Sequence, residues 1–261
     1  MRDHSEGPSG PSSASPHASA RPRPGAGHFA AIAHRAGNDR AALEEALSAG
    51  VDAVEADLRW DGGRIVARHL RRLPFLPLYW DRWCLRVDRS PQLTLDELLE
   101  QVKGRARPYL DLKALARPFP RALLETLRRH KALKEAEVSS GHWRLLSELR
   151  RSEPDLRLIR SVGSRRHLTA LLALPSDDPL RAGVAIDRDL LDEELARVLR
   201  AQGLTLYVWG IDDLEDARRL IGWGVTGVIA DSLELLRTLV SEGQACLPAG
   251  RREPGCRCRQ T

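Results

Sequence analysis

The sequence predicts one domain of the α/β class, a (β/α)8 TIM barrel, with a disordered segment at each end. Between residues 29 and 240, short apolar runs alternate with longer segments of helical periodicity. Strands that alternate with helices are typical of parallel pairing. Eight such units fill about 200 residues, which is the pattern of a (β/α)8 barrel. A doubly wound open sheet is the structural alternative.

Each predicted strand is a short run of mostly apolar residues, and each predicted helix has an apolar face. The strands are 29–34, 51–58, 107–113, 136–140, 156–162, 182–187, 204–209 and 226–231. The helices are 39–49, 94–103, 118–131, 142–152, 164–174, 189–201, 212–221 and 232–240. Polar residues that suit helix starts lie at or beside the start of four of them (Asn38, Thr94, Asp213 and Ser232), and Gly50, Gly203 and Gly222 lie near helix ends.

One segment, residues 60–93, interrupts this alternation. It is too long for a simple connection, so we expect a functional loop that folds over the mouth of the barrel. Its aromatic stretch FLPLYWDRW, residues 75–83, favours either a small satellite core or an apolar lip for an acyl chain or a sugar.

The glycines of GWGVTG, residues 222–227, match the spacing of a dinucleotide-binding turn. That turn requires a strand before it and a helix after it. Here the predicted order is the reverse, so we interpret these glycines as the turn into the last strand.

The two ends of the chain differ from its centre. Residues 1–28 and 241–261 are rich in small and polar residues and carry net charges of +1 and +2, which leaves +2 for residues 29–240. Both segments are predicted to be disordered and dispensable for chemistry. Such a balanced core excludes a nucleic-acid footprint, although the basic tail leaves peripheral membrane contact open.

The composition also bears on the compartment. No run of about eighteen apolar residues or secretory signal is present, so we expect no transmembrane segment. The four cysteines are too few for a disulfide framework, which favours a cytoplasmic location. The sequence leaves the oligomeric state open. Three of these cysteines lie in the tail, and the pair Cys256 and Cys258 is interpreted as solvated thiols.

Three carboxylates follow the alternation of two predicted strands. In VEADL, Glu55 and Asp57 share one face of the strand, and in YLDLK Asp111 and Lys113 do the same. Carboxylates placed side by side repel unless a cation is present. The sequence therefore predicts a site for Mg2+ or Ca2+. The alternative is an exposed sheet edge where arginines pair with Glu55 and Asp57.

Two histidines lie at the expected C-terminal face of the barrel. His34 ends the first strand and His69 follows the second. A pair of histidines beside a phosphate can act as general base and general acid near neutral pH. Arg35 and Lys113 would offset the negative charge of the phosphate.

These motifs resemble the glycerophosphodiester phosphodiesterase family. The stretches that carry the resemblance are HRA, GVDAVEADL, DGGRIVARH, YLDLK and LYVWGIDDLEDARRLIGWGVTGVIAD, and they span roughly residues 30–240. The resemblance implies a barrel enzyme that uses a divalent cation to hydrolyse glycerophosphodiesters to glycerol 3-phosphate and an alcohol. By the same resemblance His34 and His69 are the acid and base, Arg35 and Lys113 contact phosphate, Glu55, Asp57 and Asp111 hold the metal, and Trp209 lines the pocket.

The sequence also departs from the family pattern. Ala36 replaces a usual Gly, Leu70 and Asp111 replace a usual Asp and Glu, Asp212 replaces a frequent Asn, and the Glu-Asn-Thr stretch after the His-Arg pair is missing. Two alternatives therefore stay open. One is an enzyme like sphingomyelinase D or lysophospholipase D, which would release a cyclic phosphate from a lysophospholipid. The other is a degenerate barrel that only binds a phosphorylated ligand.

Overall fold

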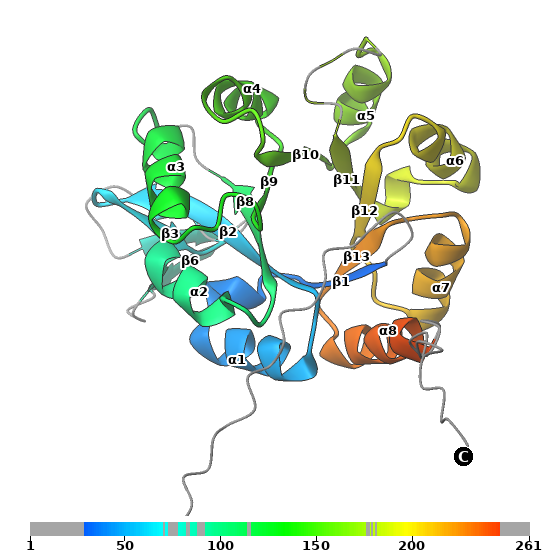
Figure 1. Ribbon diagram of the computed structural model, residues 1–261, viewed down its shortest axis with the longest axis horizontal. Coiled ribbons are helices and arrows are strands. Elements are labelled where there is room, and N and C mark those ends of the chain that lie inside the picture. Colours follow the sequence, from blue (N-terminus) through cyan, green and yellow to red (C-terminus); the bar gives the residue numbers. More distant parts are fainter. Residues whose placement is uncertain are drawn as a thin grey trace, which may run out of the picture.

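The computed structural model describes residues 29–69, 71–72, 78–81, 84–87, 92–113, 116–175, 178, 180 and 182–245. Eight parallel strands form a closed barrel, and helices surround it (Figure 1). The predicted (β/α)8 fold is confirmed, and each predicted barrel strand is present. The barrel strands are β1 (Ala30–Ala33), β2 (Ala53–Asp61), β8 (Arg107–Leu112), β9 (Glu137–Ser140), β10 (Arg157–Val162), β11 (Gly183–Asp187), β12 (Thr205–Trp209) and β13 (Gly227–Ala230).

The ring closes at β1, the first strand of the chain. It pairs in parallel with β13, the last strand, so that Ala33 lies opposite Ala230. On its other side β1 pairs in parallel with β2, where Ala33 lies opposite Val54. Closure therefore brings the residues after β1 beside those after β13, although they lie at opposite ends of the domain sequence.

The helices follow the predicted order, with boundaries that shift by a few residues. The α-helices are α1 (Arg40–Ala49), α2 (Leu95–Val102), α3 (Phe119–Arg129), α4 (Trp143–Ser152), α5 (Arg165–Leu172), α6 (Glu193–Ala201), α7 (Leu214–Gly222) and α8 (Leu233–Ala245), and short 3-10 turns cover Ala36–Asn38 and Arg188–Leu190. Thr94 caps α2 with a reciprocal bond to Glu97, and Asp213 caps α7. The prediction for Asn38 was wrong, because Asp39 caps α1 and Asn38 faces the barrel.

Two apolar layers hold the barrel. The larger lies between strands and helices and includes Val54, Ala56 and Leu58 of β2, as the alternation in VEADL predicts. The smaller fills the interior of the barrel, where Tyr109 and Tyr207 meet edge to face with ring centres 5.8 Å apart. A filled interior leaves the rim as the place for chemistry.

Residues 60–93, predicted to form a functional loop over the barrel mouth, contain short strands in the part that the structure describes. β2 continues to Asp61 and turns back through Gly62 and Gly63 into β3 (Arg64–Ala67), which pairs with it in antiparallel fashion. Both glycines have positive φ, as a two-residue hairpin turn requires. The short strand β7 (Leu93–Thr94) pairs with β3, and β4 (Arg71–Arg72), β5 (Leu78–Asp81) and β6 (Cys84–Val87) form a separate sheet.

Some predictions lie outside the described residues. They concern residues 1–28, the substitution at Leu70, the three tail cysteines and the side chains of residues 75–83. At the other end, α8 continues to Ala245, five residues beyond the predicted limit at 240. The helices of the described residues are all too short or too polar to cross a membrane.

The glycines of GWGVTG occur where the sequence places them. α7 ends at Gly222 and β13 begins at Gly227, so a helix precedes the motif and a strand follows it. A side-chain carbon at Gly227 would lie 2.6 Å from the backbone oxygen of Ala30 and 3.0 Å from the Tyr207 ring. Only glycine allows β13 to approach β1 so closely.

Gly227→Ala is therefore expected to destabilise the barrel by about 1–3 kcal/mol, because overpacking in a closed ring displaces backbone. The matched control is Gly222→Ala in the same motif, where a methyl group meets nothing within 4 Å. That substitution should leave stability unchanged or raise it slightly. Urea denaturation measures both, and equal stabilities for the two variants would contradict the close approach.

Candidate active site

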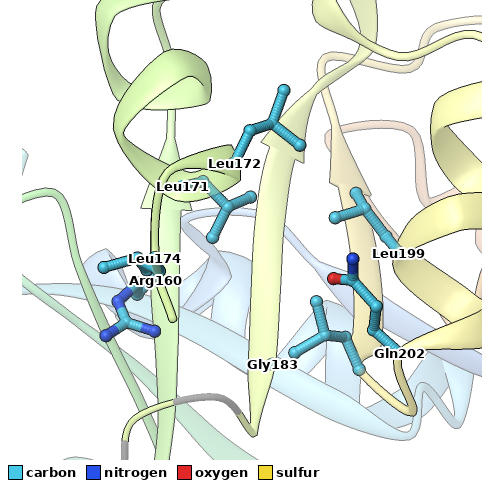
Figure 2. A pocket seen from close by; sticks show the side chains of 8 residues that line it. Arg160, Leu171, Leu172, Leu174, Gly183, Leu199 and Gln202 are labelled. Atoms are coloured by element: carbon cyan, nitrogen blue, oxygen red, sulfur yellow. The ribbon is translucent and has the colours of Figure 1, made fainter. Parts of the chain in front are cut away.

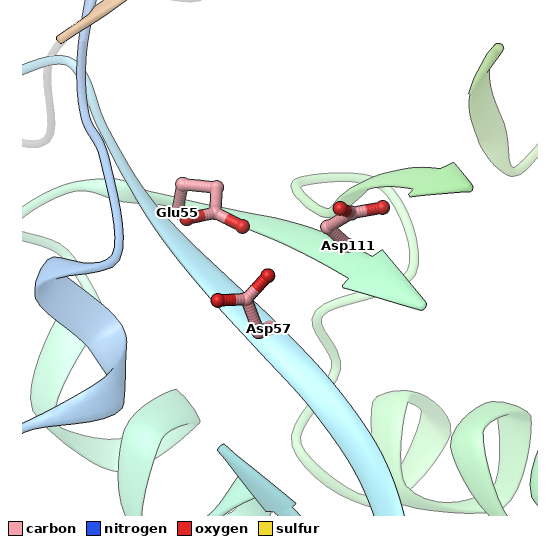
Figure 3. A group of neighbouring side chains, drawn as sticks. All are labelled: Glu55, Asp57 and Asp111. Atoms are coloured by element: carbon pink, nitrogen blue, oxygen red, sulfur yellow. The ribbon is translucent and has the colours of Figure 1, made fainter. Parts of the chain in front are cut away.

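Three carboxylates meet at one edge of the barrel mouth. Glu55 and Asp57 project from β2, and Asp111 projects from the adjacent β8, where it pairs directly with Asp57. One oxygen from each lies within 4.8 Å of the others, and Figure 3 shows the three side chains converging. Glu55 is 3% exposed and Asp57 is 1% exposed, so the alternative of an exposed sheet edge does not hold.

Lys113 supplies positive charge to this cluster. Its Nζ lies 3.1 Å from Oδ1 of Asp57 and forms an ion pair with Oδ2 of Asp111. Ser139 Oγ donates a hydrogen bond of 2.9 Å to the other oxygen of Asp111. Burial acts to lower the pKa of Lys113, but the carboxylates of Asp111 and Asp57 outweigh it and raise that pKa above its usual value. Lys113 therefore stays charged.

One lysine does not neutralise three acids, and the pKa shifts of Glu55 and Asp57 reflect this. Burial raises the pKa of Glu55 well above its usual value, and the charges of Asp57 and Asp111 act in the same direction. Burial also opposes ionisation of Asp57, but the hydrogen bond from His69 and the charge of Lys113 hold its pKa below the usual value. Negative charge is thus concentrated at this cluster.

Asn38 is a site residue that the sequence analysis missed. Its Nδ2 donates to Oδ2 of Asp57 over 2.8 Å, and its Oδ1 accepts from the Asp57 backbone N–H over 2.9 Å. The 3-10 turn Ala36–Asn38 brings the side chain over β2. The only available signal was its position after the His-Arg pair, and that position also suited a helix cap.

Arg35 contributes its backbone as well as its side chain. Its N–H donates a bond of 2.6 Å to Oε2 of Glu55, and its φ is 52°, in the left-handed region. Few non-glycine residues adopt this conformation without support from their surroundings. Its Nη2 lies 3.4 Å from Nε2 of His69. Its Nε lies 3.7 Å from Oδ2 of Asp57, so the guanidinium contacts both the acidic cluster and a predicted catalytic histidine.

The two predicted histidines each contact a carboxylate through Nδ1. His69 is 3.1 Å from Oδ2 of Asp57, and His34 is 2.9 Å from Oδ1 of Asp231, a second residue that the sequence analysis gave no role. Burial lowers the pKa of His34, and the charge of Asp231 restores only part of it. Arg59 donates to the backbone oxygens of His69, over 2.8 Å, and Lys113, over 3.3 Å, and so links the two segments.

Trp209 lies at a different part of the rim. It ends β12 and packs against the interior cluster and over Gly163, where a side-chain carbon would lie 3.2 Å from its ring. Among the described residues, no recorded contact joins it to the acidic cluster. Its predicted role in the pocket stays a prediction.

The donor set fits a hard divalent cation. All three acidic ligands offer oxygen, they come from adjacent strands of a rigid sheet, and they lie within one coordination shell. Mg2+ and Ca2+ both prefer such ligands. Burial, together with the charges of Asp57 and Asp111, raises the pKa of Glu55, as expected for a buried acidic site without a cation.

The sequence matches the Glycerophosphoryl diester phosphodiesterase family over residues 84–235, which is more than half of the chain. The chain belongs to this family. The matched range contains Asp111 and Lys113, whereas His34, Arg35 and β2 precede it. Family membership is thus established by sequence, and the placement of the earlier residues comes from the structure.

Relatives and solved structures agree with this assignment. The chain is 25% identical to a glycerophosphodiester phosphodiesterase of Bacillus subtilis (strain 168), over 54% of this chain and 52% of that protein. It is 31% identical over 68 residues to glycerophosphodiester phosphodiesterase GDPD4 of Arabidopsis thaliana, which covers 26% of this chain and 21% of that protein. The matched part therefore spans about half of the Bacillus relative and less of the plant one.

Structural likeness is more extensive. A glycerophosphodiester phosphodiesterase from Agrobacterium tumefaciens str. C58 superposes with a TM-score of 0.63 at 19% identity, over 80% of this chain and 99% of that one. A phosphodiesterase from Oleispira antarctica, solved in complex with the product sn-glycerol-3-phosphate, gives 0.64 at 19% identity, over 81% and 96%. At these identities the likeness shows the barrel fold of glycerophosphodiester phosphodiesterases.

Glu55→Gln tests the excess charge at the site. A carboxyl whose folded-state pKa is raised contributes stability below its ordinary pKa of 4.5 and loses it as pH rises through the raised value. Without metal, the variant should therefore be more stable than the wild type at about pH 8, and the difference should shrink in acid. Saturating Mg2+ or Ca2+ should reverse the order, because a bound ion stabilises the folded wild type.

Thermal denaturation with chelator and with each ion measures these differences. Glu45→Gln, on the exposed face of α1, removes a charge far from the site and is the control. A metal-free wild type that is more stable than Glu55→Gln at alkaline pH would contradict the raised pKa.

Proposed function

We propose that this protein is a metal-dependent phosphodiester hydrolase that cleaves glycerophosphodiesters to glycerol 3-phosphate and an alcohol. The observation that carries the proposal is the juxtaposition of the buried cluster Glu55, Asp57 and Asp111 with two carboxylate-bonded histidines at one rim of the barrel. Membership of the family supports it, as does the product complex of the Oleispira phosphodiesterase.

The substrate phosphate would be held by charge. A divalent ion bound to the three carboxylates would supply the positive charge that binds a phosphate oxygen and lowers the pKa of the attacking hydroxyl. Arg35 carries a fork of donors that suits two phosphate oxygens. Lys113 adds a second cation on the other side of Asp57. Together these groups would hold the phosphorus in place for attack.

The two histidines would move protons. The lowered pKa of His34 keeps its ring neutral near pH 7, as a general base requires. We therefore assign His34 to take the proton from the glycerol 2-hydroxyl. His69 contacts the Asp57 carboxylate through Nδ1, which fixes its ring, and we assign it to give a proton to the departing alcohol oxygen. Attack of the hydroxyl oxygen on phosphorus would form a cyclic phosphate as the P–O bond to the alcohol breaks, and a water molecule would then open the ring to glycerol 3-phosphate.

We also propose a substrate class and a cellular compartment. The substrate is a small phosphodiester or a lysophospholipid, and the balanced charge of residues 29–240 does not fit nucleic acid. The cysteine composition favours the cytoplasm. Trp209 is proposed to line the part of the pocket that receives the alcohol.

Phosphorus NMR of reaction products tests the function. The substrates are glycerophosphocholine, glycerophosphoethanolamine and lysophosphatidylcholine, each with Mg2+, with Ca2+ and with chelator. Glycerol 3-phosphate that forms only with a divalent ion supports the proposal. A cyclic phosphate as the final product from the lysolipid would replace it with the lysophospholipase D-like alternative. No product with either ion would favour a barrel that only binds phosphorylated ligands.

His34→Ala and His69→Ala should each lower kcat by roughly 10²–10⁴-fold, which is the usual contribution of general acid or base catalysis. The double variant should be little worse than either single one, because the residues act as a unit. His167→Ala, a half-buried histidine on α5, is the control. Steady-state kinetics measures all four, and a His69→Ala variant with near-normal turnover on a poor leaving group would remove it from the acid role.

A further inference from the structure

Closure of the barrel places Asp231 beside His34. The two residues follow β13 and β1, and these strands pair so that Ala230 lies opposite Ala33. The backbone N–H of His34 donates to the oxygen of Ala230 over 3.0 Å, which extends the ladder by one residue. Residues 34 and 231 are thus held in register by the sheet itself, despite 197 positions of separation.

The side-chain contact fixes the state of the ring. Nδ1 of His34 lies 2.9 Å from Oδ1 of Asp231. An ionised carboxylate can only accept a hydrogen bond, so Nδ1 must carry the proton. In a neutral ring the lone pair is then on Nε2. This is the tautomer in which Nε2 can take a proton from a substrate hydroxyl.

Asp231 has no evident structural duty that would explain its position. Its side chain is 69% exposed, against 22% for His34. Ser232 performs the capping of α8, since its Oγ accepts from the N–H of Leu235. Among the described residues, the Asp231 carboxylate contacts the His34 ring.

The second histidine has the same arrangement. Nδ1 of His69 contacts Asp57, as Nδ1 of His34 contacts Asp231. The two carboxylates differ in their other duties, because Asp57 also belongs to the acidic cluster and Asp231 does not. Asp231 can therefore be changed without removing a proposed metal ligand.

We propose that Asp231 is a positioning residue that holds His34 in the Nδ1-protonated tautomer, with Nε2 free to act as the base. This inference rests on the proposed function, and it adds a residue from the opposite end of the domain to the proton-transfer pair. The carboxylate also orients the imidazole toward the mouth, where water would otherwise compete for Nδ1.

Asp231→Asn and Asp231→Ala test the role by kinetics. Each should lower kcat at least about tenfold, and by less than the roughly 10²–10⁴-fold expected for loss of the base itself. KM should change by less than about twofold, because Asp231 acts on the ring and not on bound substrate. Asp231→Glu, which restores a carboxylate, should recover part of kcat.

Two comparisons separate this role from a general structural effect. Glu234→Gln removes an exposed charge three residues away on α8 and should keep wild-type kcat. Adding Asp231→Asn to His34→Ala should cost nothing further, because a positioning residue acts only through its histidine. Additive losses, or an Asp231→Asn variant equal to Glu234→Gln, would overturn the proposal.

The tautomer is also measurable without turnover. Nitrogen-15 NMR of the histidine rings in the ligand-free protein should show the His34 proton on Nδ1 in the wild type and in Glu234→Gln, and a loss of this preference in Asp231→Ala. A wild-type proton on Nε2 would overturn the inference even if the enzyme is active. An inactive wild type with the proton on Nδ1 would instead refute the proposed function alone.

Discussion

The repulsion among three buried carboxylates governs the mouth of this barrel. Glu55, Asp57 and Asp111 lie within one coordination shell and are almost fully removed from solvent. Burial of like charges is costly unless each is paired or hydrogen-bonded. The surrounding groups meet this demand in part. Lys113 forms ion pairs with Asp57 and Asp111. Asn38 makes two hydrogen bonds with Asp57, and the Arg35 N–H donates one to Glu55. The residual charge would favour a bound cation.

The same arrangement links charge to proton transfer. Asp57 serves the acidic cluster and also accepts from His69, so any change in the cluster reaches a histidine directly. His34 bonds a different carboxylate, Asp231, which does not belong to the cluster, although the charge of Asp57 also acts on its pKa. The site therefore contains one histidine bonded to a carboxylate of the cluster and one bonded to a carboxylate outside it. This asymmetry suits two histidines with opposite tasks.

Much of the fold could be predicted because strand and helix periodicities are local properties. Each barrel strand was predicted within two residues at its start, and the two-residue alternation in VEADL correctly placed Glu55 and Asp57 on the inner face. The strands within 60–93 were not predicted, because the Gly62–Gly63 turn starts a hairpin that continues β2 beyond the barrel. Asn38 was misjudged because an amide before a helix suits a cap as well as a site, and only its partner decides between them.

The sequence alone determined the alternation of elements, the closed class of fold and which acidic, basic and imidazole groups stand at strand ends, since these follow from short-range pattern and strand geometry. The tertiary structure decided the partners. The pairing of Asp57 with Asp111 depends on the register of β2 against β8, and that of His34 with Asp231 depends on the register of β1 against β13. Register is set by packing across the whole ring, so residues 197 positions apart come within a hydrogen bond only when the barrel closes.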